Sequence, residues 1–247
     1  MEHQVLRIQM HRKLAHALFH GLALWSLATA SHGLAAEVGE PDVRADINDT
    51  YVDPELDVDE WAQRFTGESR EVYTARHDVI AAMGIDSGDR VADIGAGTGI
   101  YVRLFAQRVG ADGVVHAVDI AQPFLDFVAE NAAAEGYDQV TTVLGGDRDS
   151  FLPEGDLDFV FHSDSYHHFE YPIALTRSHA RALKPGGRLF VLDFERIPGT
   201  SPPWVLGHVR AGKETVIEEI EAAGLVFVRE VELESLRDNY LLEFRRP

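Results

Sequence analysis

A carboxylate and three closely spaced glycines are the first residues of this chain whose types and spacing could do chemistry. Asp93 ends an apolar run, Gly95, Gly97 and Gly99 follow it, and an amphipathic segment begins directly after them. This pattern predicts a strand, a tight turn and a helix. A glycine turn lets a ligand approach the backbone, and the following helix N-terminus offers unpaired N–H groups. We therefore expect a nucleotide-like ligand here, with a purely structural turn as the alternative.

The spacing of the glycines bears on which ligand the turn accepts. A dinucleotide fingerprint has its third glycine three residues after the second, and this chain has Ile100 there. The sequence DIGAGTG, residues 93–99, instead resembles the first motif of class I S-adenosylmethionine-dependent methyltransferases. The resemblance implies that the turn passes beside the amino-acid end of S-adenosylmethionine. An acid suits that ligand because its ammonium and sulfonium groups are cationic.

Two further acids follow the next two expected strands. Asp119 ends the run 113–119, where an acid of nucleotide-binding folds accepts hydrogen bonds from a ribose. NAD carries the same diol, so Asp119 supports both cofactors, and it could also cap the following helix. In the resembling family an acid just after the third strand commonly holds the adenine amino group, and Asp147 matches that place. The remaining residues that we expect at the cofactor are Ile120, Arg148 and Asp164.

The densest polar group in the chain is the stretch SDSYHHF, residues 163–169, which follows the fourth expected strand. Ligands of open α/β sheets bind beyond the carboxyl ends of strands, so this loop should face the transferable methyl. Many members of the resembling family carry a histidine pair at this place. We expect His167 or His168 to take a proton from the acceptor, and Asp164 or Tyr166 to orient it. Adjacent histidines alone do not supply a metal site, so we predict none.

The expected elements arrange these residues along one edge of a sheet. Five strands alternate with helices, and a helix and two closing strands follow. An NAD-binding Rossmann domain would have six parallel strands. Residues 69–247 resemble the class I methyltransferase fold, which implies an α/β, Rossmann-like, seven-stranded, mostly parallel sheet with helices on both faces and an antiparallel last strand. The turn KPGG, residues 184–187, resembles a further motif of that family with a structural role.

The first 36 residues are not expected to belong to the fold. Basic residues precede a mostly apolar run from residue 14 to residue 30, and small residues then offer cleavage after Ala30 or Ala35. This is the layout of a secretory signal, and the run is shorter than the roughly 20 residues that span a bilayer. We expect a periplasmic or secreted protein with no stable membrane insertion after the leader is removed. A membrane tether formed by an uncleaved leader is the alternative.

Residues 37–66 are predicted to form an acidic linker and N-terminal extension, and residues 67–247 the catalytic domain. The stretch 37–59 is rich in acids and turn residues and is expected to be exposed. Trp61 and Phe65 begin an apolar register that predicts one or two helices across the ligand-binding edge. We expect Trp61, Phe65 and Tyr73 to pack in the core rather than contact a ligand.

A long irregular insert follows the fifth strand, at residues 195–204, and His208, Arg210 and Lys213 come after it. Loops on a rigid sheet often carry specificity, so we place selection of the substrate here. A solvated basic patch is the alternative.

Composition limits the partners. The formal net charge is -19, and the chain has no cysteine. A general affinity for nucleic acid or anionic membranes is therefore not expected, and thiolate chemistry is excluded. We expect a methyltransferase that moves the methyl of S-adenosylmethionine to an oxygen or nitrogen of a small molecule. The alternatives are a non-catalytic protein that binds S-adenosylmethionine or S-adenosylhomocysteine, and an NAD-dependent oxidoreductase. The leader, with ESREVY, DSYHHFEYP and DFERIPG, also resembles a branch of secreted bacterial methyltransferases.

Overall fold

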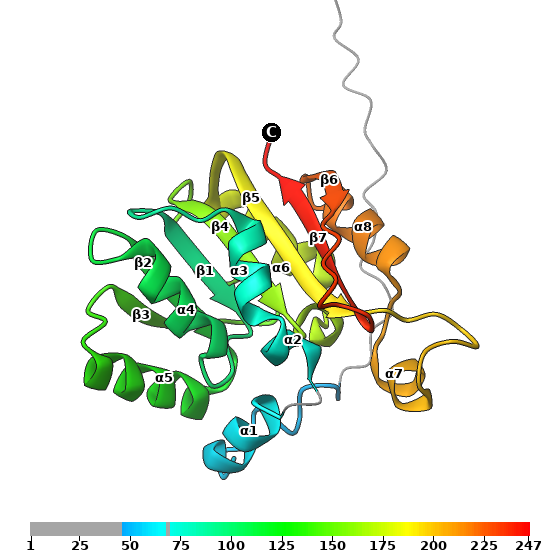
Figure 1. Cartoon of the computed structure of the whole chain (residues 1–247), viewed down its shortest axis with the longest axis horizontal. Coiled ribbons are helices and arrows are strands. Elements are labelled where there is room, and N and C mark those ends of the chain that lie inside the picture. Colours follow the sequence, from blue (N-terminus) through cyan, green and yellow to red (C-terminus); the bar gives the residue numbers. More distant parts are fainter. Residues whose placement is uncertain (1–45, 68–69) are drawn as a thin grey trace, which may run out of the picture. The chain divides into compact units, whose positions relative to one another are not determined.

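The protein contains a seven-stranded sheet with the strand order β3-β2-β1-β4-β5-β7-β6 (Figure 1). The computed structural model describes residues 46–67 and 70–247, so the predicted leader lies outside the described residues. The described residues all belong to one compact unit. The strands are β1 (Arg90–Ile94), β2 (Val114–Asp119), β3 (Val140–Leu144), β4 (Leu157–Ser163), β5 (Leu183–Phe194), β6 (Val226–Glu230) and β7 (Asn239–Arg245).

The pairing of the strands confirms the predicted fold. Strands β1 to β5 pair in parallel, whereas β7 lies between β5 and β6 and runs antiparallel to both. The order along the sheet reverses at β1, because β2 and β4 flank it on opposite sides. A crevice for a ligand forms at such a switch point, beyond the carboxyl ends of the strands.

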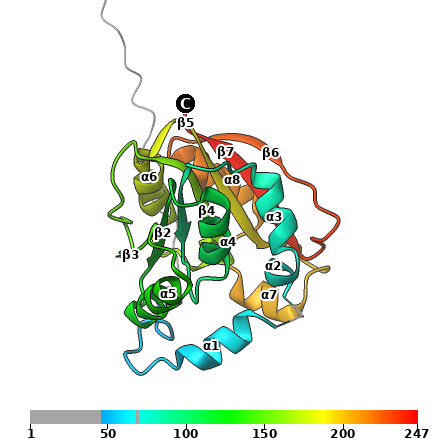
Figure 2. The same ribbon diagram turned by 60° about the vertical axis from the view of Figure 1, so that its left-hand side comes forward.

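Helices cover both faces of the sheet (Figures 1 and 2). One hydrophobic core joins α3, α4 and α5 to residues such as Val91 and Phe161, and the other joins α6 and α8 to residues such as Ala92 and Val160. Neighbouring strand residues face opposite cores, as expected for parallel strands that are buried on both sides. The helices are α1 (Val58–Phe65), α2 (Glu71–Thr74), α3 (Arg76–Met83), α4 (Ile100–Val109), α5 (Gln122–Glu135), α6 (Pro172–Ala182), α7 (Pro203–His208) and α8 (Lys213–Ala222).

Two segments differ from the sequence prediction. Strand β5 begins at Leu183 and so includes the stretch 184–187 that was expected to be a turn, because Leu183 already pairs with Leu157 before a register shift in the ladder. The insert after β5 contains a short helix, α7, where an irregular loop was expected. No helix among the described residues combines the length and the apolar character needed to cross a bilayer.

Candidate functional site

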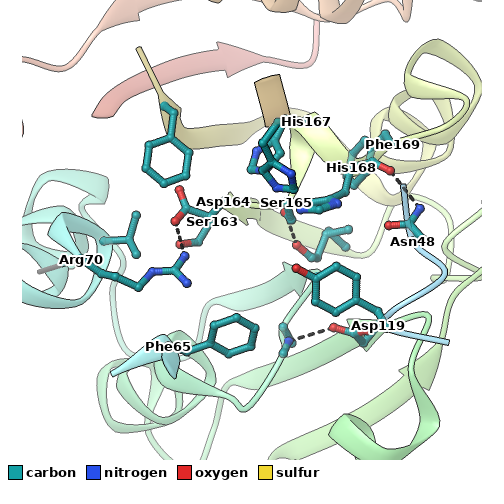
Figure 3. Close-up of a pocket in the computed structure, with 18 of the residues that line it drawn as sticks. Asn48, Phe65, Arg70, Asp119, Ser163, Asp164, Ser165, His167, His168 and Phe169 are labelled. Atoms are coloured by element: carbon teal, nitrogen blue, oxygen red, sulfur yellow. Dashed lines mark hydrogen bonds and ion pairs between the residues drawn. The ribbon is translucent and has the colours of Figure 1, made fainter. Parts of the chain in front are cut away.

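A cavity of about 1330 Å³ lies where the carboxyl ends of β1, β2 and β4 meet (Figure 3). Its lining includes the glycine turn after β1, the end of β2, the loop after β4, and parts of the segments 48–72 and 194–208. The sheet therefore brings the predicted motifs together at the edge where ligands of open α/β sheets bind.

The glycine turn approaches its neighbours too closely for side chains. Gly95 has φ +71°, and a Cβ added there would lie 2.5 Å from the Cβ of Ser165. The amide of Gly97 donates a hydrogen bond of 2.8 Å to the Asp119 carboxylate, which joins the turn to the end of β2. Gly99, which was predicted at the cofactor, is not among the residues that line the cavity, and a Cβ there would meet Val128 of α5 at 2.9 Å. Gly99 serves helix packing.

Two buried acids lie beside this turn. Burial raises the pKa of Asp93 to about 8, and the nearby charge of Asp119 adds to the effect. Burial also raises the pKa of Asp119, while hydrogen bonds from the backbone amides of Ala121 and Gly97 oppose the rise. The Ala121 bond, 2.9 Å long, places Asp119 at the start of α5 as well as in the cavity. A cationic ligand would restore the electrostatic stabilisation that burial removes from these carboxylates.

The other predicted cofactor residues divide into two groups. Ile120 and Asp147 line the cavity, and the side chain of Asp147 is exposed. Arg148 is not among the residues that line the cavity, and its guanidinium lies over the Tyr171 ring, 3.3 Å from the centroid. The aromatic ring attracts the cation away from the ligand edge.

Asp164 occupies the middle of the cavity wall (Figure 3). Its φ is +48°, and its carboxylate is held 2.5 Å from the guanidinium of Arg70 and 3.1 Å from the amide nitrogen of Asn239. Burial raises its pKa to about 6, although the Arg70 charge opposes the rise. No local pattern predicts Arg70 or Asn239 at the site, since the fold brings them from distant segments.

His167 is paired with a buried acid, Asp193, that no local pattern predicts at the site. Its Nδ1 lies 2.7 Å from Asp193 on β5. Burial lowers the pKa of His167, but the charge and hydrogen bond of Asp193 outweigh burial and raise it. The imidazole and the backbone amides of His167 and Phe194 hold the pKa of Asp193 low against the effect of burial. In contrast, burial and the neighbouring imidazoles of His167 and His208 lower the pKa of His168 to about 3.

Tyr166 is not part of this wall. It is fully buried in the core beside α6 and α8, and its hydroxyl donates to Glu219 over 3.2 Å. The expectation that Tyr166 orients an acceptor is therefore wrong, because the short helical turn Tyr166–His168 directs its first side chain into the core and away from the cavity.

A third histidine joins the predicted pair. His208, at the end of α7, lines the cavity, and its ring centroid lies 5.1 Å from that of His167 and 5.0 Å from that of His168. The insert thus contributes residues to the lining of the cavity, and its role in selecting the substrate stays a prediction. The alternative of a solvated basic patch is wrong, because Arg210 pairs with Glu219 at 2.6 Å and Lys213 pairs with Glu195 at 2.8 Å.

The N-terminal segment closes one side of the cavity, contrary to two expectations. Asn48, in the stretch expected to be an exposed linker, donates to the backbone carbonyl of His168 over 3.0 Å. Trp61 and Phe65 are half-buried and line the cavity, although core packing was expected. Their rings contact each other at 5.2 Å, and that of Trp61 contacts Tyr51 at 5.0 Å. Helix α1 thus presents Trp61 and Phe65 to the cavity.

Comparisons with known proteins agree with this geometry. Residues 92–191 match the protein family described as "Methyltransferase domain". The chain is 35% identical over 130 residues to a nocamycin O-methyltransferase from Saccharothrix syringae, covering 51% of this chain and 44% of the relative. It is 31% identical over 122 residues to a ubiquinone/menaquinone biosynthesis C-methyltransferase from Chromobacterium violaceum, covering 49% and 50%. The chain thus spans about half the length of these relatives.

The fold is similar to that of a SAM-dependent methyltransferase from Aquifex aeolicus, with a TM-score of 0.64 and 23% identity. This likeness covers 77% of this chain and 98% of the other. The family match confirms the prediction of a methyltransferase domain and implies S-adenosylmethionine as its cofactor.

Proposed function

We propose that this chain, which carries a class I S-adenosylmethionine-dependent methyltransferase domain over residues 92–191, transfers the cofactor's methyl to an oxygen or nitrogen of a small molecule. One observation carries the proposal. A continuous cavity joins the glycine turn and its acids to the wall that holds Asp164, His167 and His168. A methyl donor at the turn and an acceptor at the histidines would meet inside it.

The first half of the cavity suits the cofactor. The backbone of Gly95 and Gly97 is open to a ligand, and Asp93 and Asp119 are carboxylates with raised pKa values. S-adenosylmethionine brings an ammonium, a sulfonium and a ribose diol to such groups. A pyrophosphate would meet the same carboxylates with repulsion, which disfavours the oxidoreductase alternative.

The second half has room for an acceptor. Single-ligand pockets have volumes of about 300–1,000 Å³, so a cavity of about 1330 Å³ can hold the cofactor and a second small molecule. His167 is the better proton acceptor of the pair, because Asp193 holds Nδ1 and leaves Nε2 as the basic atom. His168 is the weaker base, since its pKa is lowered to about 3.

The reaction requires little covalent chemistry from the protein. The acceptor atom attacks the methyl carbon, the S–CH₃ bond breaks, and its electron pair remains on the sulfur of S-adenosylhomocysteine. An acceptor that carries a proton gives it to His167. Most of the acceleration would come from holding both reactants in line within a cavity that aromatic side chains shield from water. The two named relatives act in the chemistry of small molecules, which supports an acceptor of this class.

We also infer that the protein is exported. The basic residues, the apolar run from residue 14 to residue 30 and the small residues at the two cleavage points support a secretory signal. Mass spectrometry of the native protein would show a mature N-terminus at residue 31 or 36. A native protein of full length would contradict cleavage.

The test of the function has two stages. Calorimetric titration should show binding of S-adenosylmethionine and none of NAD. Methyl transfer is then followed with isotope-labelled cofactor across phenols, carboxylic acids and amines. Replacing both His167 and His168 by alanine should lower turnover about 10²–10⁴-fold while cofactor affinity is kept. The matched control is His77→Ala, an exposed histidine on α3. Tight binding of S-adenosylhomocysteine without any product would favour the non-catalytic alternative, and unchanged turnover would remove the pair from the mechanism.

A further inference from the structure

Three histidines converge at the acceptor end of the cavity. His167 and His168 come from the short helical turn after β4, and His208 comes from the end of α7. One ring nitrogen of each lies within 4.8 Å of one ring nitrogen of each other histidine. The prediction of no metal considered only the adjacent pair, and the fold supplies a third imidazole. We propose that His167, His168 and His208 bind one zinc-like divalent metal ion that holds the acceptor's hydroxyl oxygen.

The distances permit a metal site after a small movement. Two nitrogens on one tetrahedral zinc ion are about 3.4 Å apart, because each Zn–N bond is about 2.0–2.1 Å. Nitrogens that now lie within 4.8 Å of one another reach this separation if the rings close inward by about 1 Å. Three neutral imidazoles with no thiolate ligand favour zinc among common metals, and such a set leaves the fourth position open.

The surroundings of His167 support this assignment. Asp193 accepts the hydrogen bond of Nδ1–H at 2.7 Å and is itself buried. A carboxylate behind the imidazole fixes the tautomer and directs Nε2 outward, which is the usual arrangement of a histidine that binds a metal. Asp193 also accepts the backbone amide of His167 at 3.1 Å. Asp193 thus fixes both the backbone and the imidazole ring of His167.

His168 gives an independent observation. Its Nδ1 is buried and has no hydrogen-bond partner among the residues that the structure describes. A buried ring nitrogen without a partner is uncommon and costs free energy. A metal ion between the three rings would satisfy this nitrogen. The backbone carbonyl of His168 is fixed separately, by the side chain of Asn48 at 3.0 Å.

The open position would define the substrate. All three histidines line the cavity, so the fourth ligand comes from the same space as the acceptor. Zinc lowers the pKa of a bound water to about 7, and it acts in the same way on a bound hydroxyl. The acceptor's O–H bond ionises and the proton passes to solvent. The oxygen then forms the O–CH₃ bond as the S–CH₃ bond breaks. This role rests on the proposed methyl transfer, and it replaces His167 as the proton acceptor. The metal site itself does not depend on methyl transfer.

The test measures metal binding by the full chain without a histidine tag and without cofactor. Zinc titration should give one ion per chain, and cobalt should give the visible absorption of a four-coordinate site. His208→Ala and His208→Asn should abolish both signals, and Asp193→Asn should weaken zinc binding about 10–100-fold. His77→Ala is the control and should bind as the parent does. Circular dichroism and thermal unfolding identify variants that keep the fold.

Two results would overturn the inference: absence of stoichiometric zinc binding in the parent protein, or undiminished binding in a folded His208 variant. A catechol or other hydroxyl compound should shift the cobalt spectrum, and no shift with any transferable acceptor would reject the role of the metal. Methyl transfer that persists in chelator-treated protein would reject that role and leave the proposed function intact. One zinc ion bound per chain with no methyl transfer would support the metal site and contradict the proposed function.

Discussion

Replacing Gly95 by alanine tests how the glycine turn organises the site. The backbone at Gly95 has φ +71°, a conformation that costs an alanine about 1–2 kcal/mol. The new Cβ would also lie 2.5 Å from the Cβ of Ser165, and apolar carbons require about 3.5 Å. Ser165 must therefore move by about 1 Å, away from the β1 carbonyl of Ile94 to which its hydroxyl donates at 2.8 Å. Losing that bond costs about 1 kcal/mol more.

We expect Gly95→Ala to lower the free energy of unfolding by about 2–4 kcal/mol, with about 5–15 °C lost in Tm. Cofactor affinity should fall at least tenfold, because Ser165 carries the loop that holds Asp164 and the histidine pair. Chemical denaturation gives the free energy of unfolding, and calorimetric titration of S-adenosylmethionine gives the affinity.

Gly136→Ala is the matched control for this substitution. Gly136 ends α5 with φ +76°, and nothing lies within 4 Å of an added Cβ. The Gly136→Ala variant should therefore lose only the backbone cost, about 1–2 kcal/mol in free energy of unfolding, and should keep normal cofactor affinity. If Gly95→Ala is as stable as Gly136→Ala and binds the cofactor equally well, the contact between the turn and the β4 loop does not position the site.

Three further predictions concern the cavity and its surroundings. Asp93 has a pKa of about 8, and a cationic ligand favours its charged form, so affinity for S-adenosylmethionine should rise from pH 6 to pH 8. Asp93→Asn should remove this rise in calorimetric titrations, and a variant that retains it would show that another group titrates. Tyr166→Phe should cost about 1 kcal/mol in denaturant unfolding and leave methyl-transfer kinetics unchanged, since its buried hydroxyl donates to Glu219 and does not line the cavity; reduced turnover at full cofactor occupancy would return Tyr166 to the site. Trp61→Ala should weaken cofactor binding about tenfold, equivalent to about 1.4 kcal/mol, with little effect on unfolding; an unchanged Kd would place the cofactor away from α1.

The sequence predicted the sheet because its strands are short apolar runs bounded by turn residues. Apolar Tyr240, Leu242 and Phe244 occupy alternate positions of the antiparallel strand β7, although Leu241 and Glu243 between them are buried as well. The position of Asp119 was also predictable, since an acid that ends a strand next to a glycine turn must lie at the ligand edge. The local sequence pattern was sufficient to predict a residue's position where that position depends on its own strand alone.

Residues that reach the site from other elements could not be predicted in this way. Asp193 ends an apolar strand, and its partner His167 follows a different strand, so the pair exists only through the β4–β5 register. Arg70 and His208 lie in segments without a periodic signal. Trp61 and Phe65 have helical spacing, which indicates an apolar face but not whether a ligand or the protein core covers it.

The bond from Asn48 to the backbone carbonyl of His168 makes the segment before α1 part of the cavity wall. The chain before α1 acts as a structural wall on the acceptor side. Either expected leader cleavage, after Ala30 or Ala35, keeps that wall in the mature protein. A protease that cut beyond Tyr51 would remove both Asn48 and the ring that contacts His168 at 5.2 Å, and the cavity would open to water while the sheet stayed intact.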